Sequence, residues 1–521
     1  MIPVLDSRRM RAADEAAIRA GTPSEVLMEN AAAALCAELR RAHPGWQRVA
    51  VLCGPGKNGG DGLAAARLLA LAGVVPSVFT LKDPEEYSGD PAVNLSRARA
   101  VGVTPTALTD ARGFAALSRA LSECDGVVDA LFGTGLSRAL SGAARRAVLR
   151  LNASGRAVVA ADVASGVSAD TGALLGPAVR AERTVAFGAP KPCHLLPPAS
   201  GFCGRLIVAD IGIPKRILEA RGARESLMEE EDVRALLPPR PLESNKGDFG
   251  RLAVIAGSRG KAGAALLAAR GGIRGGAGLV TVFCAESVAP LVVANLPEAM
   301  TEPLPESGGA IAASAAKPVA RALARFDAAA VGPGLGSSPE TVAFLETVLR
   351  ETRLPVLVDA DGLNAFAGRP GFFKRRRGPL VLTPHPGEAG RLLGKMARAV
   401  QSDRFGAART LARSTGSVVL LKGARTLVAE PGGRLTANAT GTPLMATGGS
   451  GDVLAGLIGA LLAGGLDPVD SARAGAWLHG AAGEDLESLL GDAGLLVHEL
   501  ADAVPLARRR LRRPPSSPAA E

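Results

Sequence analysis

Two series of short apolar runs, each run followed by a helical pattern, constrain the fold of this 521-residue chain most strongly. The first series begins at RVAVLCG (residues 48–54) and ends at RLIVADIG (205–212). The second begins at RLAVIAG (251–257) and ends at SVVLLKG (417–423). Strand-length runs that alternate with helical patterns are typical of a doubly wound α/β sheet. Because the chain is also too long for one ordinary core, the sequence predicts two α/β domains.

The segment between the two series, residues 213–245, loses the strand pattern. It ends in clustered prolines and polar residues, which are typical of a domain boundary. We expect a first domain over residues 1–215, a linker over 216–240, a second domain over 241–505 and a basic, Pro- and Ser-rich tail over 506–521. The two series share no residue-level repeat, so the sequence does not support an origin by duplication.

Composition argues against several functional classes. Aromatic residues make up 3% of the chain, which leaves few platforms on which single-stranded nucleic acid could stack its bases. Much of the net charge of +10 lies in two runs, 374–377 and 508–513, which lack interleaved aromatics and which we interpret as solvated surface. The six cysteines form no C-x-x-C pair. The N-terminus lacks the apolar core of a signal peptide. The longest apolar run is too short to span a bilayer. We therefore expect a cytoplasmic protein that binds neither nucleic acid nor a membrane.

A glycine-rich loop, GPGKNGGDG (residues 54–62), follows the first strand pattern. It lacks the Lys-Ser or Lys-Thr pair of a phosphate-binding P-loop, and it matches the dinucleotide-binding pattern G-x-G-x-x-G only in spacing. A tight turn with Asp61 near a helix N-terminus would explain the loop as well. Taken alone, the loop does not define a function.

Three strand ends in the first domain carry oxygen ligands. Ligands of open α/β sheets bind beyond the carboxyl ends of strands, where this sequence places Asn58, Asp129 and Ser165. Amide, carboxylate and hydroxyl oxygens suit an alkali or alkaline-earth cation rather than zinc. Asp162 would then be free as an acid–base group, although a buried structural aspartate is the alternative.

A second glycine loop, GGSGDVLAGL (residues 448–457), favours phosphoryl transfer. Its glycines allow backbone N–H groups to approach an anion at the start of a helix that we expect near Asp452. The Asp452 carboxylate is placed to take a proton from a hydroxyl that attacks phosphorus. A role as the helix N-cap would explain the aspartate but not the glycines before it.

The first domain resembles the NAD(P)H-hydrate epimerase family. The resemblance rests on LMENAAAAL (27–35), CGPGKNGGDGLAAARLLA (53–70), VVDALFGTGLS (127–137), ADVASGVSADTG (161–172) and TVAFGAPKPCHLLPPASGFCGRLIVADIGIP (184–214). It implies a Rossmann-like, usually dimeric domain that interconverts the R and S hydrates of NADH and NADPH, with a potassium ion near the substrate.

The epimerase motifs also assign roles to individual residues. By resemblance, the potassium ligands are Asn58, Asp129 and Ser165, and Asp162 contacts the substrate. The other implied substrate contacts are Lys57, Asn58, Gly59, Gly60, Asp61, Gly133, Thr134, Gly135, Leu136, Ser137, Arg138 and Ala139. The chain departs from the family at Lys57, where many relatives have Asn, and at Ala164, where Pro is usual. Lys57 either favours a phosphorylated substrate or is simply solvated.

The second domain resembles the ADP- or ATP-dependent NAD(P)H-hydrate dehydratase family of ribokinase-like fold. The motifs are KGDFGRLAVIAGSRGKAGAALLAARGGIRGGAGLVTV (246–282), GPGLG (332–336), DADGLN (359–364), LTPHPGEAGRLL (382–393), LKGARTLVA (421–429) and PLMATGGSGDVLAGLIGALLAGG (443–465). The resemblance implies that ADP or ATP, with Mg²⁺, phosphorylates the hydroxyl of the hydrate and that phosphate then leaves.

The dehydratase motifs divide into two groups of contacts. The implied hydrate contacts are Ala264, Gly336, His385 and Asp452. The implied adenine-nucleotide contacts are Lys422, Gly423, Ala424, Arg425, Thr426 and Gly451. Taken alone, His385 lies between prolines and is equally well explained as a structural histidine.

The two resemblances together predict a bifunctional, homo-oligomeric enzyme that epimerises the hydrates of NADH and NADPH (NADHX and NADPHX) and dehydrates the S form. One alternative is a ribokinase-type kinase that phosphorylates a vitamin precursor. In that case the N-terminal half of the chain would be a non-catalytic binding module. A dehydrogenase is disfavoured, because no G-x-G-x-x-G with a later ribose-binding acid follows either first strand.

Overall fold

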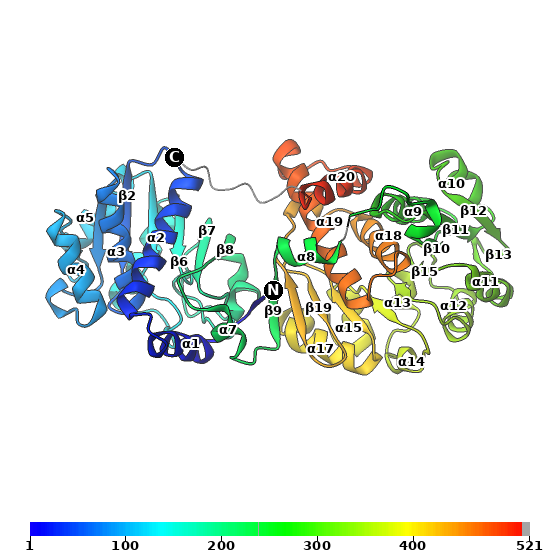
Figure 1. Ribbon diagram of the computed structural model, residues 1–521, viewed down its shortest axis with the longest axis horizontal. Helices are drawn as coiled ribbons and strands as arrows, with labels where there is room; N and C mark the ends of the chain where they lie inside the picture. Colours follow the sequence, from blue (N-terminus) through cyan, green and yellow to red (C-terminus); the bar gives the residue numbers. More distant parts are fainter. Residues whose placement is uncertain (238, 513–521) are drawn as a thin grey trace. The chain divides into compact units, whose positions relative to one another are not determined.

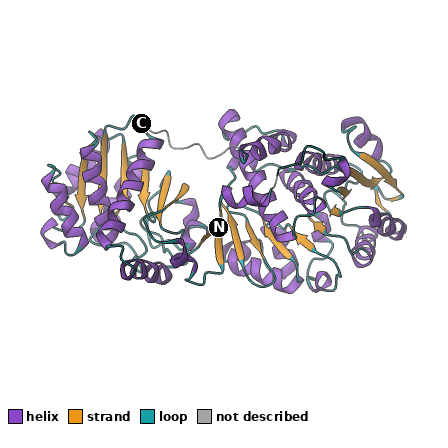
Figure 2. Cartoon of the chain, in the orientation of Figure 1, coloured by secondary structure: helices purple, strands orange, loops and turns teal. Residues whose placement is uncertain are grey.

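A computed structural model describes residues 1–237 and 239–512. The chain divides into two compact units, of which one spans Ile2–Glu225 and the other starts at Ser226 (Figure 1). In each unit, α-helices pack on a mainly parallel sheet (Figure 2). The predicted α/β class is therefore confirmed.

The first unit is built on a seven-stranded parallel sheet in the order β4-β3-β2-β5-β6-β7-β8. Its strands are β2 (Arg48–Cys53), β3 (Val75–Thr80), β4 (Thr106–Ala107), β5 (Gly126–Ala130), β6 (Ala157–Ala161), β7 (Arg183–Phe187) and β8 (Arg205–Ala209). Its helices are α1 (Ser7–Arg19), α2 (Ser24–Ala42), α3 (Lys57–Leu71), α4 (Asp90–Ala100), α5 (Ala111–Glu123), α6 (Gly142–Ala153) and α7 (Lys215–Glu219), and the short strand β1 (Ile2–Pro3) precedes α1.

Both faces of this sheet are buried, which explains the continuous apolar runs in the sequence. On β2, Val49 and Val51 pack into a core with residues of α1 to α4, whereas Ala50 and Leu52 pack into a second core with residues of α5 and α6. Strands of parallel sheets are covered by helices on both sides and therefore lack a polar face. The order of the strands reverses between β2 and β5, and such switch points are where open α/β sheets bind ligands.

The second unit contains a larger sheet, in which the strands from β20 to β12 follow the order β20-β19-β18-β17-β16-β15-β10-β11-β12. The strands of this unit are β9 (Glu225–Met228), β10 (Arg251–Ile255), β11 (Leu279–Ala285), β12 (Met300–Leu304), β13 (Glu306–Ser307), β14 (Ala310–Ile311), β15 (Ala328–Val331), β16 (Val356–Val358), β17 (Leu380–Leu382), β18 (Val418–Leu421), β19 (Leu427–Ala429) and β20 (Leu435–Asn438). The β18–β19 and β19–β20 pairs are antiparallel, and the other pairs from β12 to β18 are parallel.

Thirteen α-helices accompany this sheet among the described residues. They are α8 (Glu230–Leu236), α9 (Ala262–Gly275), α10 (Ala289–Asn295), α11 (Ala316–Ala322), α12 (Pro339–Glu351), α13 (Asp361–Asn364), α14 (Gly371–Lys374), α15 (Pro386–Leu393), α16 (Ala397–Ser402), α17 (Arg404–Thr415), α18 (Ser450–Ala463), α19 (Pro468–Leu490) and α20 (Val497–Arg510). Helix α18 contacts α9 and the strands β10, β15 and β16. The N-terminus of α18, which carries the predicted catalytic loop, is thereby fixed over the middle of the sheet.

The close contact between α18 and α9 depends on glycine. A Cβ atom at Gly456 of α18 would lie 1.8 Å from the carbonyl oxygen of Ala268, and one at Gly271 of α9 would lie 2.3 Å from the carbonyl oxygen of Val453. Real Cβ atoms do not approach backbone oxygens so closely, so any side chain at either position would push the helices apart.

Two segments are more ordered than the sequence pattern predicts. The predicted linker 216–240 contains α7, β9 and α8, and α8 is stabilised by a capping box between Glu229 and Asp232. The predicted tail 506–521 is helical as far as Arg510, and the next residue, Leu511, is buried. Its remainder from residue 513 lies outside the described residues.

All six cysteines are buried, and none of them forms a disulfide. Among the described residues, the structure contains no helix that combines the length and the apolar character needed to cross a membrane.

The α9–α18 contact leads to a stability prediction. We expect Gly456→Ala to lower the free energy of unfolding by about 1–3 kcal/mol, because the added methyl group overpacks the helix contact. Gly464→Ala is the matched control, since a Cβ there would lie 3.4 Å from the nearest atom, the Ala460 carbonyl oxygen. Denaturant titration of both variants measures the difference. Equal losses in the two variants would contradict the proposed contact.

Candidate active sites

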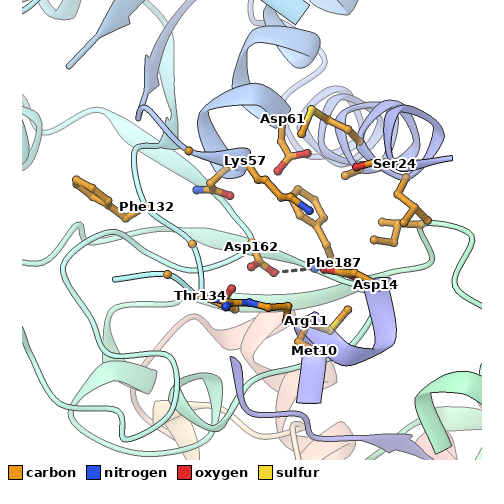
Figure 3. Close-up of a pocket in the computed structure, with 18 of the residues that line it drawn as sticks. Met10, Arg11, Asp14, Ser24, Lys57, Asp61, Phe132, Thr134, Asp162 and Phe187 are labelled. Atoms are coloured by element: carbon orange, nitrogen blue, oxygen red, sulfur yellow. Dashed lines mark hydrogen bonds between the residues drawn. The ribbon is translucent and has the colours of Figure 1, made fainter. Parts of the chain in front are cut away.

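A cavity of about 580 Å³ opens in the first unit beyond the carboxyl ends of β2, β5 and β6 (Figure 3). Its wall on the sheet side consists of the loops that follow these strands, and α1 and α2 supply the other wall. The cavity therefore lies at the switch point of the sheet, where a ligand is expected. Its volume is within the range of small-molecule and cofactor sites.

The cavity brings together part of the predicted substrate site. Predicted residues that line it are Lys57, Asn58, Asp61, Gly133, Thr134, Gly135, Leu136 and Asp162. Predicted residues that do not line it are Gly59, Gly60, Ser137, Arg138 and Ala139. A Cβ atom at Gly59 would lie 1.8 Å from the carbonyl oxygen of Gly54, so this glycine allows the first turn of α3 to pack against the preceding loop.

Asp162 is held in an unusual backbone conformation at the end of β6. Its φ angle is +63°, a region that residues other than glycine rarely adopt and that is often found at functional sites. The His194 ring contacts the Asp162 carbonyl oxygen through Nε2 at 2.9 Å. Nδ1 of the same ring accepts a hydrogen bond from the Lys191 backbone N–H, so Nε2 carries the proton and donates it to that carbonyl.

The two carboxylate oxygens of Asp162 have different surroundings. Oδ1 forms an ion pair with Nζ of Lys191, which is completely buried, and accepts a hydrogen bond of 3.1 Å from the Phe187 backbone N–H. In the part of the chain that the structure describes, Oδ2 takes part in no hydrogen bond. Figure 3 shows the carboxylate in the cavity, so Oδ2 is available to a ligand.

Behind the cavity, the structure joins two of the three predicted cation ligands. Ser165 donates hydrogen bonds to both oxygens of Asp129, from Oγ at 2.7 Å and from its backbone N–H at 2.8 Å. Burial raises the pKa of the Asp129 carboxyl to about 6. The Oδ1 and Nδ2 atoms of Asn58 are buried and have no hydrogen-bond partner among the described residues. A buried carboxylate without an ion-pair partner and an amide oxygen without a hydrogen-bond donor are both suited to bind a cation.

The cavity also contains charged residues that the sequence analysis missed. Asp14 and Arg11 come from α1, and Lys191 comes from the segment after β7. A signal for Asp14 was present, because it lies on the helix face that also carries the buried residues Met10 and Ala17. An acid among the buried positions of an amphipathic helix indicates a special role.

Three aspartates line the cavity and influence one another's pKa. Burial raises the pKa of Asp14 to about 6, and the positive charges of Lys191 and Lys57 oppose this shift. Burial, followed by the negative charges of Asp162 and Asp14, raises the pKa of Asp61 well above its usual range. In Figure 3 the three side chains enter the cavity from different elements: α1, α3 and the loop after β6.

In the second unit, Asp452 lies in the first turn of α18. This helix begins at Ser450, two positions before the expected start, and its N-cap is Gly449 with a φ of +96°. Asp452 is therefore not the N-cap, and the alternative explanation for this aspartate is wrong. Burial raises the pKa of the Asp452 carboxyl to about 7, and the negative charge of Asp359 adds to the shift.

A partly buried lysine faces the start of α18. Nζ of Lys422 lies 2.6 Å from Oδ1 of Asp359 and 3.9 Å from Oε2 of Glu388. A Cβ atom at Gly451 would lie 3.2 Å from the same Nζ, so the first turn of the helix, the ammonium group and the carboxylates form one cluster. The following loop is held by Arg404, which is buried and donates hydrogen bonds to the carbonyl oxygens of Leu421 and Lys422.

The other predicted dehydratase residues lie around this cluster in different ways. The Gly336 backbone N–H donates to Oδ2 of Asp361 at 2.8 Å, and the negative charge of Asp361 also acts on Asp452. Ala264 lies beside the same glycine loop, 2.9 Å from the position of a Cβ at Gly334. His385 caps α15: its Nδ1 accepts a hydrogen bond of 2.9 Å from the Gly387 backbone N–H. A structural role for His385 is thus evident, and its contact with substrate stays a prediction.

The described residues contain no group of three or more His, Cys, Asp or Glu side chains that could hold a metal ion. A site for a divalent ion that is shared with a nucleotide needs fewer ligands from the protein. Mg²⁺ commonly binds in this way, through one or two carboxylates and the phosphates of a nucleotide.

Two protein-family models match the chain. The model described as "NAD(P)H-hydrate dehydratase" matches residues 252–506, and the model described as "YjeF-related protein N-terminus" matches residues 24–193. The first match contains the Asp452 cluster, and the second contains most of the cavity residues.

Curated relatives match nearly the whole chain. A protein of Moorella thermoacetica named bifunctional NAD(P)H-hydrate repair enzyme Nnr is 41% identical, with 94% of this chain and 93% of the relative covered. A protein of the same name from Thermofilum pendens is 41% identical, with 96% of this chain and 94% of the relative covered. The protein of that name from Escherichia coli is 36% identical, with 93% of this chain and 90% of the relative covered.

A solved structure matches about half of the chain. It is the ADP/ATP-dependent NAD(P)H-hydrate dehydratase of Bacillus subtilis, co-crystallised with ATP/Mg²⁺, at 36% identity and a TM-score of 0.48. The match covers 55% of this chain and 98% of the solved one.

Proposed function

The chain belongs to the family of bifunctional NAD(P)H-hydrate repair enzymes, and we propose which residues of its two units perform the epimerase and dehydratase reactions. The unit that starts at Ser226 contains the dehydratase match, and the unit Ile2–Glu225 contains the other match. The observation that carries the assignment is that each unit places a carboxylate able to accept a proton at the carboxyl ends of its strands.

Asp162 is the proposed acid–base residue of the epimerase. Its Oδ1 is fixed by Lys191 and Phe187, whereas Oδ2 is free to exchange a proton with the hydroxyl group on the hydrated carbon of the nicotinamide ring. The predicted residues that line the cavity, Lys57, Asn58, Asp61 and Gly133 to Leu136, are the proposed contacts for the rest of the substrate. Ser137, Arg138 and Ala139 would act from outside the cavity wall.

A potassium ion fits the residues behind this cavity. Asp129 accepts hydrogen bonds from Ser165 and Leu131 but forms no ion pair with any described residue, and the Asn58 amide has no partner. We propose that Asn58, Asp129 and Ser165 hold the ion through their side-chain oxygens. When bound, K⁺ supplies the positive charge that the buried Asp129 carboxylate lacks.

Asp452 is the proposed base of the dehydratase. Its carboxylate removes the proton from the hydroxyl of the S hydrate as the oxygen attacks the terminal phosphorus of ADP or ATP, and AMP or ADP leaves with the electron pair of the broken P–O bond. Backbone N–H groups in the first turn of α18 face the transferred phosphoryl group, as expected at a helix N-terminus. Phosphate then leaves with the electron pair of the C–O bond while the ring loses a proton, which restores NAD(P)H.

The remaining predicted residues would complete the second site. Lys422 to Thr426 and Gly451 would bind the adenine nucleotide, and Ala264, Gly336 and His385 would contact the hydrate. The carboxylates of Asp359 and Glu388, which flank Lys422, fit a Mg²⁺ ion whose other ligands are water and phosphate oxygens. The protein is proposed to act as a homo-oligomer in the cytoplasm, without a nucleic-acid or membrane partner.

Separate assays of the two hydrate epimers test whether the first unit performs epimerisation and the second performs dehydration. We expect pure S hydrate plus ADP or ATP to recover the absorbance of reduced nicotinamide in wild type and in Asp162→Ala alike. Pure R hydrate should be recovered by wild type and about 10²–10⁴-fold more slowly by Asp162→Ala, because the variant lacks the acid–base group. Recovery of R hydrate at the wild-type rate in the variant would refute the role of Asp162. No recovery of either epimer by wild type would favour the vitamin-precursor kinase.

The pKa of Asp452 predicts the pH dependence of the dehydratase. Because the base must be deprotonated and its pKa is about 7, kcat/KM for the S hydrate should fall about tenfold per pH unit below pH 7. Asp452→Asn should lose about 10²–10⁴-fold in kcat. Asp467→Asn, at the exposed N-cap of α19, serves as the control with an unchanged profile. A flat profile from pH 8 to pH 5.5 would contradict the assignment.

The potassium site can be tested without an activity assay. The pKa of Asp129 is about 6 in the folded protein against an ordinary value of 3.8, so its ionised form lowers stability above pH 6 unless a cation is bound. We expect KCl to raise Tm above the value in choline chloride at pH 7.5, and less so at pH 5. Asp129→Asn should show the same Tm in both salts. Identical wild-type Tm values in both salts would argue against the site.

A further inference from the structure

The carboxyl group of Asp14 lines the epimerase cavity but has no part in the roles assigned above. It projects from α1, the wall opposite the strand ends, where it is partly buried beside Met10 and near Lys57 and Lys191. Within the described residues, the Asp14 carboxyl forms no hydrogen bond and no ion pair. A partly buried, unpartnered carboxyl costs stability, and such groups in clefts are candidates for a chemical role.

The chemistry of epimerisation requires more than one acid–base group. Inversion of a carbon that bears a hydroxyl group means that the oxygen leaves from one face and returns to the other. One carboxylate fixed by Lys191 and Phe187, as Asp162 is, cannot serve both faces. A second group must therefore give or take a proton on the opposite side of the ring.

We infer that Asp14 is the second acid–base residue of the epimerase and serves the face of the nicotinamide hydrate opposite to Asp162. The inference rests on the proposed role of Asp162. Two observations support it: the two carboxyl groups enter one cavity from opposite walls, α1 and the end of β6, and each has an oxygen without a protein partner. Asp61, the third aspartate of the cavity, lies on α3 and is already a proposed substrate contact.

The environment of Asp14 suits the role of a proton donor. Burial holds its pKa near 6, so a protonated fraction exists near neutral pH, whereas Asp162 is paired with an ammonium group. The charged groups that act on Asp14 are Lys191, Lys57, Asp162 and Glu15, together with Asp61, whose own pKa the charge of Asp14 raises. Two carboxyl groups with such different surroundings are typical of an acid and a base in one site.

The reaction can be written with both residues. The Asp14 carboxyl gives its proton to the hydroxyl oxygen, and the C–O bond breaks with its electron pair, so that water leaves. The lone pair of the ring nitrogen meanwhile forms a C=N bond. Water then adds to the opposite face, the C=N electron pair returns to nitrogen, and the Asp162 carboxylate takes the proton released by the water. The reverse sequence converts the other epimer, and no oxidant or reductant is needed.

The test compares Asp14→Asn with a control of equal charge change. Asn has nearly the same shape as Asp but cannot transfer a proton. In the full-length protein, Asp14→Asn should lower kcat for R-to-S conversion at least about 100-fold, with KM within about threefold of wild type. Its dehydration of pure S hydrate should be unchanged. Glu25→Gln, on the exposed side of α2, should keep the wild-type rate of epimerisation.

A stability measurement separates a catalytic from a structural role. The pKa of Asp14 is raised in the folded state, so its ionisation lowers stability above pH 6. Asp14→Asn removes this cost and should have an equal or higher Tm at pH 7.5. A variant with a lower Tm and a parallel loss of activity would instead show a structural role and overturn the inference.

The remaining outcomes are also distinct. Epimerisation by Asp14→Asn within threefold of the wild-type rate would overturn the inference, while the loss in Asp162→Ala would leave the proposed function intact. If both variants kept the wild-type rate, the proposed epimerase site itself would be wrong.

Discussion

Burial of carboxyl groups in the sites beyond the ends of the parallel strands is the constraint on which both units depend. A parallel sheet covered by helices on both faces has little water around its edges, so acids placed there lose solvation. Burial is the largest cause of the raised pKa values of Asp14, Asp61, Asp129 and Asp452. The same loss of solvation that weakens the folded state gives Asp14 and Asp452 pKa values of about 6 and about 7, which suit proton transfer near neutral pH.

Both units offset part of this burial with a lysine from a later segment of the chain. Lys191 pairs with Asp162 after β6, and Lys422 pairs with Asp359 after β16. In each case a residue other than glycine at the same strand end has a positive φ, Asp162 at +63° and Ala360 at +49°. The two units share no sequence repeat, so the common arrangement reflects a common physical problem, which is to hold an acid in a fixed direction at a strand end.

The fold was predictable from the sequence because its central strands are apolar on both faces. Strands such as β2 and β10 appear as continuous runs between helical patterns, whereas the short antiparallel strands β19 and β20 carry no such signal. Motif residues such as Asp162 were predictable because they follow these strands directly. Asp14 could not be predicted as a site residue, because the sequence pattern places it on a helix but does not say which strand ends that helix faces. The linker was predicted from its loss of strand pattern and its clustered prolines and polar residues, which are typical of a domain boundary but do not reveal the short helices α7 and α8.

The distribution of the buried thiols has a consequence for how the chain can be observed. Burial raises the pKa of Cys36, Cys53, Cys193 and Cys284, and a protonated, enclosed thiol does not react with alkylating reagents. The unit Ile2–Glu225 holds five of the six cysteines, and Cys284 is the one cysteine of the other unit. The rate at which the cysteines of each unit are alkylated, measured by mass spectrometry, therefore reports the unfolding of that unit separately. The measurement needs no introduced label.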